Sequence, residues 1–169
     1  DFMVFDLDPY QYSGREGRGA EPELSRPAFK RARRLALDLR EIAASLGLEA
    51  FVKTSGRTGL HLYLPIRREF TFTEVRAMAE TIGRHLRSRH PRDVTLEWSV
   101  KKRTGKIFFD YNQNVRGKSL AAAYSPRRHP LATVSMPLTW DELETAYPTD
   151  FTMATAPDIL ESRSDPWGG

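Results

Sequence analysis

The chain has 169 residues, of which 40% are hydrophobic and 28% are charged. This length and composition predict one globular domain with a substantial core and exclude a disordered protein. The sequence contains no cysteine, which excludes disulfides and thiolate-bound metals, and no apolar run approaches the ~20 residues that a membrane-spanning helix needs. Lysine and arginine outnumber aspartate and glutamate by 26 to 22. Basic residues crowd positions 84–128, whereas positions 141–165 are acidic, a pattern typical either of a surface that faces a polyanion or of an ordinary solvated face.

A first strand is predicted at residues 2–7, where an apolar run ends in D-L-D and is closed by Pro9. Because side chains alternate along a strand, Asp6 and Asp8 project from one face while Leu7 points into the core. Two carboxylates this close repel each other, and a divalent ion such as Mg²⁺ or Mn²⁺ would relieve the repulsion. The alternative interpretation is a solvated strand end. A glycine-rich, charged loop is predicted next, at residues 11–22.

A helix is predicted to begin at Ser25 and to end at Gly47, because apolar residues recur between them at helical spacing. Two short strands follow at residues 50–54 and 60–65, joined by S-G-R-T-G.

The connection between these two strands has the composition of a phosphate-binding turn. Ser55 offers a hydroxyl group, and Gly56 allows a tight turn that exposes backbone N–H groups. Alternation places Lys53 on the same face as Ser55, so that Lys53, Ser55 and His61 could converge on a triphosphate. The alternative is an ordinary glycine-rich hairpin with an exposed histidine.

A second amphipathic helix is predicted at residues 73–89, followed by strands at residues 94–100 and 106–111. Beyond residue 112 the sequence is irregular, with a short helix expected at residues 141–146. The element order β-α-β-β-α-β-β predicts an α/β fold of the α+β type, in a single domain that spans residues 1–169.

The strand at residues 106–111 carries Asp110 near its end, in K-I-F-F-D-Y. If this strand lies beside residues 2–7, then Asp6, Asp8 and Asp110 form a platform for two divalent ions about 3.5–4 Å apart, which is the arrangement that clamps a phosphoryl transfer. Cations flank Asp110 in the sequence, and they could either guide nucleotide or nucleic-acid phosphates towards the metals or simply neutralise the local acid. They include Arg103, Lys106, Arg116 and Lys118.

Taken together, three motifs in this order resemble the archaeo-eukaryotic primase superfamily. They are V-F-D-L-D-P, V-K-T-S-G-R-T-G-L-H-L-Y-L-P-I and K-I-F-F-D-Y-N-Q-N-V-R-G-K-S. Within the superfamily the sequence is most similar to the polymerase domain of bacterial ligase D and its stand-alone relatives. The tail from A-A-A-Y-S-P-R-R-H-P to T-W-D-E-L extends the resemblance over almost the whole chain.

The resemblance implies a primase-polymerase catalytic core with a mixed or antiparallel, RRM-like sheet, two main helices and a loop-rich C-terminal tail. It also implies a nucleotidyltransferase that adds nucleotides, often ribonucleotides, to a primer 3′ end with two divalent ions, usually Mn²⁺. Family members act on DNA primer-templates or DNA ends in non-homologous end joining. The implied setting is the bacterial cytoplasm, at the nucleoid, beside a DNA ligase and a Ku-type end-binding protein and without a membrane.

Individual residues can be matched to the family's motifs. Asp6 and Asp8 match the first metal-binding motif and Asp110 matches the third. Ser55 and His61 match the motif that binds the triphosphate.

Lys118 and Arg127 lie where the family has basic residues near the incoming nucleotide, which is a looser correspondence. Family polymerase domains usually carry a long segment before D-L-D-P. The present chain is therefore expected to be a catalytic core that lacks this segment, either as an excised core or as an unusually short member of the family.

Two other functions remain open from the residues alone. A D-x-D motif at a strand end also occurs in phosphohydrolases of the haloacid-dehalogenase type, although that motif continues D-x-D-x-T and residue 10 here is tyrosine. A non-catalytic nucleic-acid-binding fragment would keep the basic residues around a vestigial metal site.

Overall fold

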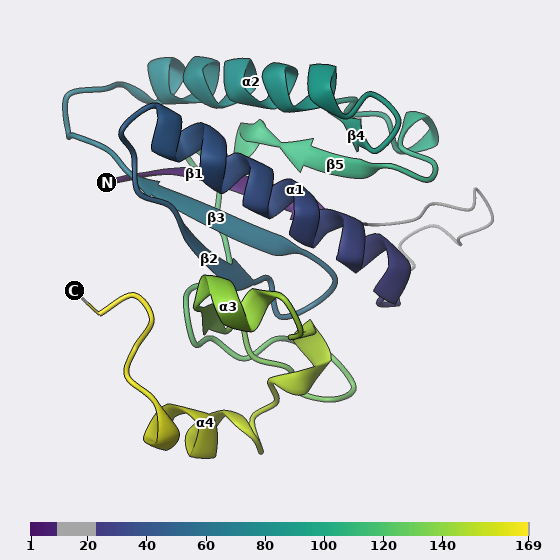
Figure 1. The fold of residues 1–169 in the computed structure, drawn as a ribbon, viewed down its shortest axis with the longest axis vertical. Helices are drawn as coiled ribbons and strands as arrows, with labels where there is room; N and C mark the ends of the chain where they lie inside the picture. Colours follow the sequence, from purple (N-terminus) through teal and green to yellow (C-terminus); the bar gives the residue numbers. More distant parts are fainter. Residues whose placement is uncertain (10–22, 169) are drawn as a thin grey trace.

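A six-stranded mixed sheet forms the centre of the computed structural model, which describes residues 1–9 and 23–168 (Figure 1). The strands are β1 (Phe2–Asp8), β2 (Phe51–Thr54), β3 (Leu60–Pro65), β4 (Val94–Thr95), β5 (Ile107–Asp110) and β6 (Pro137–Leu138). They lie in the order β4-β5-β1-β3-β2-β6, and every pair is antiparallel except β4 and β5. The loop predicted at residues 11–22 lies outside the described residues. The first strand of the chain is therefore an interior strand, with β5 on one side and β3 on the other.

Two long helices, α1 (Arg26–Ser45) and α2 (Phe72–Arg89), lie side by side against the sheet (Figure 1). The side chain of Ser25 caps the start of α1, and Gly47 adopts φ +72° just after its end. Thr71 and Glu74 form a capping box at the start of α2. Both helices are confirmed close to their predicted limits.

Alternation along the strands separates the apolar side chains from the ionisable ones. Leu7 on β1 lies opposite Leu60 on β3 and Phe109 on β5, and Phe5 lies opposite Leu62. These five side chains are completely buried in the core that the sheet shares with α1 and α2. The residues between them in the sequence consequently face the other side of the sheet.

The strand predicted at residues 94–100 is shorter in the structure and ends at Thr95. The guanidinium of Arg103 donates hydrogen bonds to the backbone carbonyl oxygens of Glu97 and Trp98, at 2.8 and 2.7 Å. Because these carbonyl groups are occupied by a side chain, they are not available to a strand ladder. The chain turns instead into the 3₁₀ helix η1 (Val100–Lys102).

The C-terminal part of the chain is more regular than predicted. It contributes β6 next to β2, and it contains η2 (Tyr111–Asn114), α3 (Trp140–Leu143), η3 (Pro148–Asp150) and α4 (Ala156–Ser162). The short helix predicted at residues 141–146 corresponds to α3. Near the end of the chain, the ring of Trp167 packs against those of Tyr63 and Phe51, with centroids 5.0 and 5.9 Å apart.

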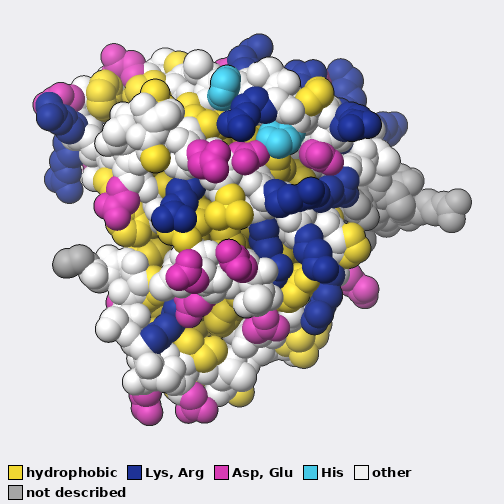
Figure 2. Space-filling view, in the orientation of Figure 1, with side chains coloured by type: hydrophobic (Ala, Val, Ile, Leu, Met, Phe, Trp, Pro, Cys, Tyr) yellow, Lys and Arg dark blue, Asp and Glu magenta, His cyan; other side chains and the backbone are white. Residues whose placement is uncertain are grey.

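Figure 2 views the molecule in the orientation of Figure 1, from the side on which α1 lies. Basic and acidic side chains are intermixed over the helices, and acidic side chains predominate around α3 and α4, as the acidic composition of residues 141–165 predicts. Within the described part of the chain, no helix combines the length and apolar character that crossing a bilayer requires.

Candidate active site

Four ionisable residues form a row across the face of the sheet that points away from α1 and α2. Asp110 on β5 lies opposite Asp6 on β1, Asp6 lies opposite His61 on β3, and His61 lies opposite Lys53 on β2. Residues directly opposite each other in an antiparallel pair share a face, with Cβ atoms about 4.5–5.5 Å apart. The sheet thus places β1 and β5 side by side and brings together the residues that the sequence predicted for a metal and phosphate site.

Asp6 is buried and lies close to two other carboxyl groups, and both conditions raise its pKa. Burial raises the pKa of Asp6 to about 8, and the neighbouring carboxylates of Asp8 and Asp110 add to the increase, while Lys53 opposes it. Asp8 shares the face of Asp6, because it lies two residues further along β1. At neutral pH and without a cation, these three carboxyl groups therefore retain a proton that a metal ion could replace.

Asp110 is held in a fixed orientation by the turn that follows it. Its Oδ1 accepts a hydrogen bond from the backbone N–H of Asn112 at 2.8 Å, and its Oδ2 accepts one from the side-chain amide of Gln113 at 3.2 Å. Burial raises the pKa of Asp110, whereas the Asn112 hydrogen bond and the nearby cations Lys118 and Arg103 lower it. The turn η2 thus orients one carboxylate of the row.

The donor set suits an open metal site rather than a closed one. Among residues 1–9 and 23–168, no three aspartate, glutamate or histidine side chains are gathered as a ready-made metal cage. Mg²⁺ usually takes one or two protein carboxylates and completes its coordination with water and substrate phosphates. Asp6, Asp8 and Asp110, with their oxygen donors and the raised pKa of Asp6, fit an ion that is bound in this way.

His61 is buried between Asp6 and Lys53, and its contacts determine where its proton lies. The Nζ of Lys53 is 3.0 Å from Nδ1 of His61, and Nε2 of His61 is 3.6 Å from Oδ1 of Asp6. Burial lowers the pKa of His61 well below its usual value, and the charges of Lys53 and Arg127 lower it further, so the ring is neutral. When Lys53 is charged, Nδ1 accepts from its ammonium group, and the proton of the neutral ring is then on Nε2, the nitrogen that faces Asp6.

Lys53 lies beneath this site and has no exposed surface. Its Nζ donates to Oγ of Ser135, to Nδ1 of His61 and to the backbone oxygen of Thr54. Burial and the charge of Arg127 lower the pKa of Lys53 to about 7, although Asp6 opposes the change. An ammonium group has three N–H donors, and here all three are directed into the protein.

The hydroxyl group of Ser55 lies in the β2–β3 turn, two residues beyond Lys53. Oγ of Ser55 accepts from the backbone N–H of Gly59 at 3.0 Å and from that of Arg57 at 3.2 Å. A hydroxyl oxygen that accepts two hydrogen bonds can still donate its own proton. Gly56 has φ +74°, and a Cβ there would lie 2.4 Å from Cγ of Arg127, so the turn requires glycine at this position.

Two of the predicted basic residues border the carboxylate row. Arg127 packs against Gly56 and is close enough to Lys53 and His61 to lower the pKa of each. Lys118 is exposed, and its charge lowers the pKa of Asp110. The structure therefore brings positive charge to both ends of the row.

The three remaining cations occupy different environments. Arg103 is buried, and its guanidinium carbon lies 3.3 Å from the centre of the Phe108 ring. Lys106 precedes the start of β5, at the end away from Asp110, and donates to the backbone oxygen of Pro91 at 2.8 Å. Arg116 is exposed in the segment after η2.

Sequence reasoning did not identify Ser135 or Gln113 as members of the site. Ser135 reaches Lys53 from 82 residues further along the chain, and no local pattern in the sequence reports such a contact. The N-Q-N that follows Asp110 is a typical turn composition and could have indicated Gln113.

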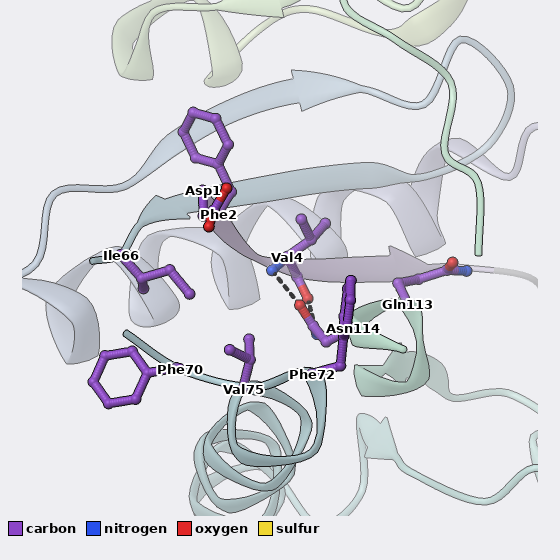
Figure 3. Close-up of a pocket in the computed structure, with 9 residues that line it drawn as sticks. All are labelled: Asp1, Phe2, Val4, Ile66, Phe70, Phe72, Val75, Gln113 and Asn114. Atoms are coloured by element: carbon purple, nitrogen blue, oxygen red, sulfur yellow. Dashed lines mark hydrogen bonds between the residues drawn. The ribbon is translucent and has the colours of Figure 1, made fainter. Parts of the chain in front are cut away.

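A hollow lies at the end of β1 where the chain begins, and its lining is mainly apolar (Figure 3). Its lining includes Ile66, Phe72 and Val75. Beside it, the side chain of Asn114 bonds both backbone groups of Val4, accepting from the N–H at 2.8 Å and donating to the carbonyl at 2.7 Å. Asn114 therefore takes the place of a strand partner there, and Gln113, which also lines the hollow, donates to Asp110 of the row.

Comparison with known proteins places these features in a family. The family described as LigD, primase-polymerase domain, matches residues 1–167. The chain is 35% identical over 170 residues to the multifunctional non-homologous end joining protein LigD of Pseudomonas aeruginosa, covering 99% of this chain and 19% of that protein. It is 33% identical over 167 residues to the bifunctional non-homologous end joining protein LigD of Bacillus subtilis, covering 98% of this chain and 25% of that protein.

A solved structure supports the same relationship at the level of the fold. The polymerase domain from Mycobacterium tuberculosis ligase D, in complex with DNA, superposes with a TM-score of 0.73 at 29% sequence identity. The superposition covers 99% of this chain and 56% of that one. The present chain thus spans about a quarter or less of these two full-length relatives and just over half of the solved domain.

Proposed function

The chain belongs to the LigD primase-polymerase family, and on that basis we propose that it is the catalytic core of a nucleotidyltransferase that extends the 3′ end of a DNA primer during end-joining repair. The observation that carries this proposal is the strand register. Asp6 lies opposite Asp110 on one neighbouring strand and opposite His61 on the other. A carboxylate pair and a neutral hydrogen-bond donor therefore share one face of the sheet.

We assign Asp6, Asp8 and Asp110 to two divalent ions, Mn²⁺ or Mg²⁺. When bound, such ions supply activation of the primer 3′-hydroxyl group and neutralisation of the leaving pyrophosphate. The contribution of the chain is to keep the three carboxyl groups in register, with Asp110 fixed by Asn112 and Gln113.

The nucleotide triphosphate, as NTP or dNTP, is assigned to the other half of the row. Ser55 has a hydroxyl proton to donate, and the Nε2–H of His61 points towards the carboxylates, so both can donate to phosphate oxygens. The turn backbone at Gly56 and the cations Arg127 and Lys118 add positive potential around them. Lys53 acts through His61, because its own ammonium group is turned inwards.

The wider setting is also a proposal, because this chain spans only part of its relatives. Their printed names describe multifunctional or bifunctional end-joining proteins. We therefore infer that the chain works on DNA ends in the bacterial cytoplasm, at the nucleoid, together with a DNA ligase activity and a Ku-type end-binding protein. The exposed cations Lys118 and Arg116, the buried Arg103 and the more distant Lys106 would contribute unequally to DNA binding.

Primer extension tests the assignment of the carboxylates. The wild-type chain is expected to extend a labelled primer on a DNA template with Mn²⁺ and NTP. The Asp6→Asn/Asp8→Asn variant should lose at least about 100-fold in rate, because metal-assisted charge stabilisation contributes several kcal/mol. Asp158→Asn/Glu161→Gln, which changes two exposed residues of α4, is the matched control and should retain the wild-type rate.

The same assay separates the alternatives. Undiminished extension by the Asp6→Asn/Asp8→Asn variant would overturn the metal assignment. DNA binding without any extension by the wild-type chain would favour a non-catalytic binding fragment. The phosphohydrolase alternative predicts release of inorganic phosphate and an aspartyl-phosphate, and the family match over residues 1–167 does not support it.

A further inference from the structure

Trp98 is a large aromatic residue at the border of the carboxylate face, and 60% of its surface is exposed. It lies in the segment between β4 and η1, and its ring makes an edge contact with Phe108, with centroids 6.1 Å apart. Phe108 in turn lies opposite Asp8 on the neighbouring strand. A chain of direct neighbours therefore leads from the exposed indole to the proposed metal site.

The buried side chain of Arg103 holds the segment that carries the exposed ring. Arg103 is buried and donates hydrogen bonds to the carbonyl oxygens of Glu97 and Trp98. Its guanidinium carbon lies 3.3 Å from the centre of the Phe108 ring and 5.7 Å from that of Trp98. The segment that presents Trp98 is thus fixed by a charged side chain that is sandwiched against an aromatic ring, and little reorganisation is needed for the indole to receive a partner.

A second cation lies over the same ring. The Nζ of Lys118 is 5.5 Å from the Trp98 centroid, and Lys118 is close enough to Asp110 to lower the pKa of that carboxyl group. An exposed aromatic ring accompanied by exposed positive charge is an arrangement that proteins use to bind single-stranded nucleic acid, because bases stack on rings and phosphates contact the cations.

We propose that Trp98 is a stacking platform for one unpaired DNA base, and that Lys118 contacts the phosphate of the same strand. The indole stacks on the base face, which every base possesses, so the contact is independent of sequence. Phe108 lies between the platform and Asp8, so the platform would hold the strand near the site where its end, or the end paired to it, is extended. In this last respect the inference rests on the proposed function, whereas the binding of DNA does not.

Binding of fluorescein-labelled oligo(dT), followed by anisotropy at fixed salt, tests the platform. Trp98→Ala is expected to weaken binding by about tenfold, the usual effect of removing one base-stacking aromatic residue. Trp98→Phe keeps an aromatic face and should recover most of the affinity. Phe72→Ala is the matched control, because Phe72 is 59% exposed and lines the hollow at the other end of β1, and it should bind as the wild-type chain does.

A blunt, fully paired DNA duplex of the same length distinguishes a loss of base stacking from a general loss of DNA binding by this surface. It offers no unpaired base along its length, so its affinity should change much less than that of oligo(dT) on Trp98→Ala substitution. Equal weakening towards both ligands, or unchanged binding of oligo(dT), would overturn the proposal. If Trp98→Ala does not fold, the tryptophan fluorescence of Trp98→Phe decides. Oligo(dT) is expected to quench the fluorescence of the wild-type chain and to lose this effect in Trp98→Phe. Quenching that Trp98→Phe retains in full would contradict the platform.

Failure of this inference can be told apart from failure of the proposed function. If the wild-type chain extends primers but Trp98→Ala binds oligo(dT) normally, only the platform is wrong. If the wild-type chain extends no primer but Trp98→Ala still loses affinity for oligo(dT), the platform stands and the catalytic assignment fails.

Discussion

Asp6 has Asp110 opposite it on β5 and His61 opposite it on β3. Burial, with the charges of Asp8 and Asp110, raises the pKa of Asp6 to about 8 in the metal-free protein. In the unfolded chain an aspartate titrates near pH 4, so between pH 4 and pH 8 folding requires Asp6 to keep a proton that the unfolded state has lost. The stability associated with this group is therefore complete below about pH 4 and is lost as the pH rises towards 8.

Replacing Asp6 with asparagine should stabilise the metal-free protein at alkaline pH. In EDTA at pH 8, Asp6→Asn is expected to raise Tm by at least about 2–4 °C, the shift that ~1 kcal/mol produces in a domain of this size. The difference should close towards pH 4, where the wild-type carboxyl group is protonated. Thermal denaturation across this pH range checks the prediction, with Asp158→Asn as control. A variant that is less stable than the wild type at pH 8 would contradict this electrostatic account.

Lys53, Ser135 and His61 form a buried hydrogen-bonded relay. Its proposed role is to determine which ring nitrogen of His61 carries the proton. Lys53 donates to both Oγ of Ser135 and Nδ1 of His61, and Ser135 donates onward to the backbone oxygen of Thr54 at 2.8 Å. Without the lysine, nothing in this relay would keep Nδ1 of His61 unprotonated. The ring could then turn a bare Nε2 towards the triphosphate and lose its donor.

Lys53→Met is therefore expected to raise the KM for NTP more than it lowers kcat. ¹⁵N NMR of the histidine side chains should show His61 as the Nε2–H tautomer in the wild type and as a mixture of tautomers in the variant. Lys30→Met, a change at an exposed position of α1, is the control. If His61 keeps a single tautomer in Lys53→Met while the KM still rises, the relay does not act through the proton.

At the scale of elements, the β2–β3 turn couples the site to the first strand. A Cβ at Gly59 would lie 2.4 Å from the backbone oxygen of Leu7, one residue from both Asp6 and Asp8. Any side chain there must push the turn and β1 apart, which would separate Ser55 from the carboxylates.

Gly59→Ala is expected to lower the free energy of unfolding by about 1–3 kcal/mol, the usual cost of overpacking, and to weaken NTP binding as well. Gly47→Ala is the comparison, because Gly47 has φ +72° with open space around it. It should cost about 1 kcal/mol of stability and leave NTP binding unchanged. Urea denaturation and NTP titration measure the two quantities. Wild-type NTP affinity in Gly59→Ala would show that the turn and β1 are not coupled in this way.

The elements that the sequence predicted well are those with a local signal. Alternation in residues 60–65 and helical spacing in residues 73–89 each report burial on one side of a single element. The two-residue strand β6 has no such signal, because its existence depends on pairing with Val52 and Lys53 far away in the sequence. The strand predicted to reach residue 100 stops early for a similar reason, since Arg103 takes the carbonyl groups of Glu97 and Trp98.

Some residues of the candidate site could likewise be predicted from local sequence signals, whereas the contacts of others could not. The motif residues on β1, β3 and β5 could be proposed from strand-end carboxylates and a resemblance, and the register brings them together. The sequence also suggested that Lys53 reaches the triphosphate, whereas its ammonium group is turned towards Ser135 and His61. Side-chain alternation gives the face on which a residue lies, but not how deeply neighbouring segments bury it.

In the molecule as a whole, four adjacent strands of the sheet contribute residues to one site. This chain covers 56% of the solved ligase D polymerase domain. Its residues provide the metal and triphosphate contacts that we propose, and Trp98 provides the proposed contact with a DNA strand. We propose that Asp6, Asp8 and Asp110 hold the metals beside a triphosphate that is bound by Ser55 and His61.

A crystal structure of the chain soaked with Mn²⁺ and a non-hydrolysable NTP would locate both ligands, because the anomalous scattering of manganese identifies each ion. We expect manganese peaks between Asp6, Asp8 and Asp110, with phosphate oxygens within hydrogen-bond distance of Oγ of Ser55 and Nε2 of His61. Manganese bound away from these three carboxylates, or a triphosphate that touches neither Ser55 nor His61, would contradict the account.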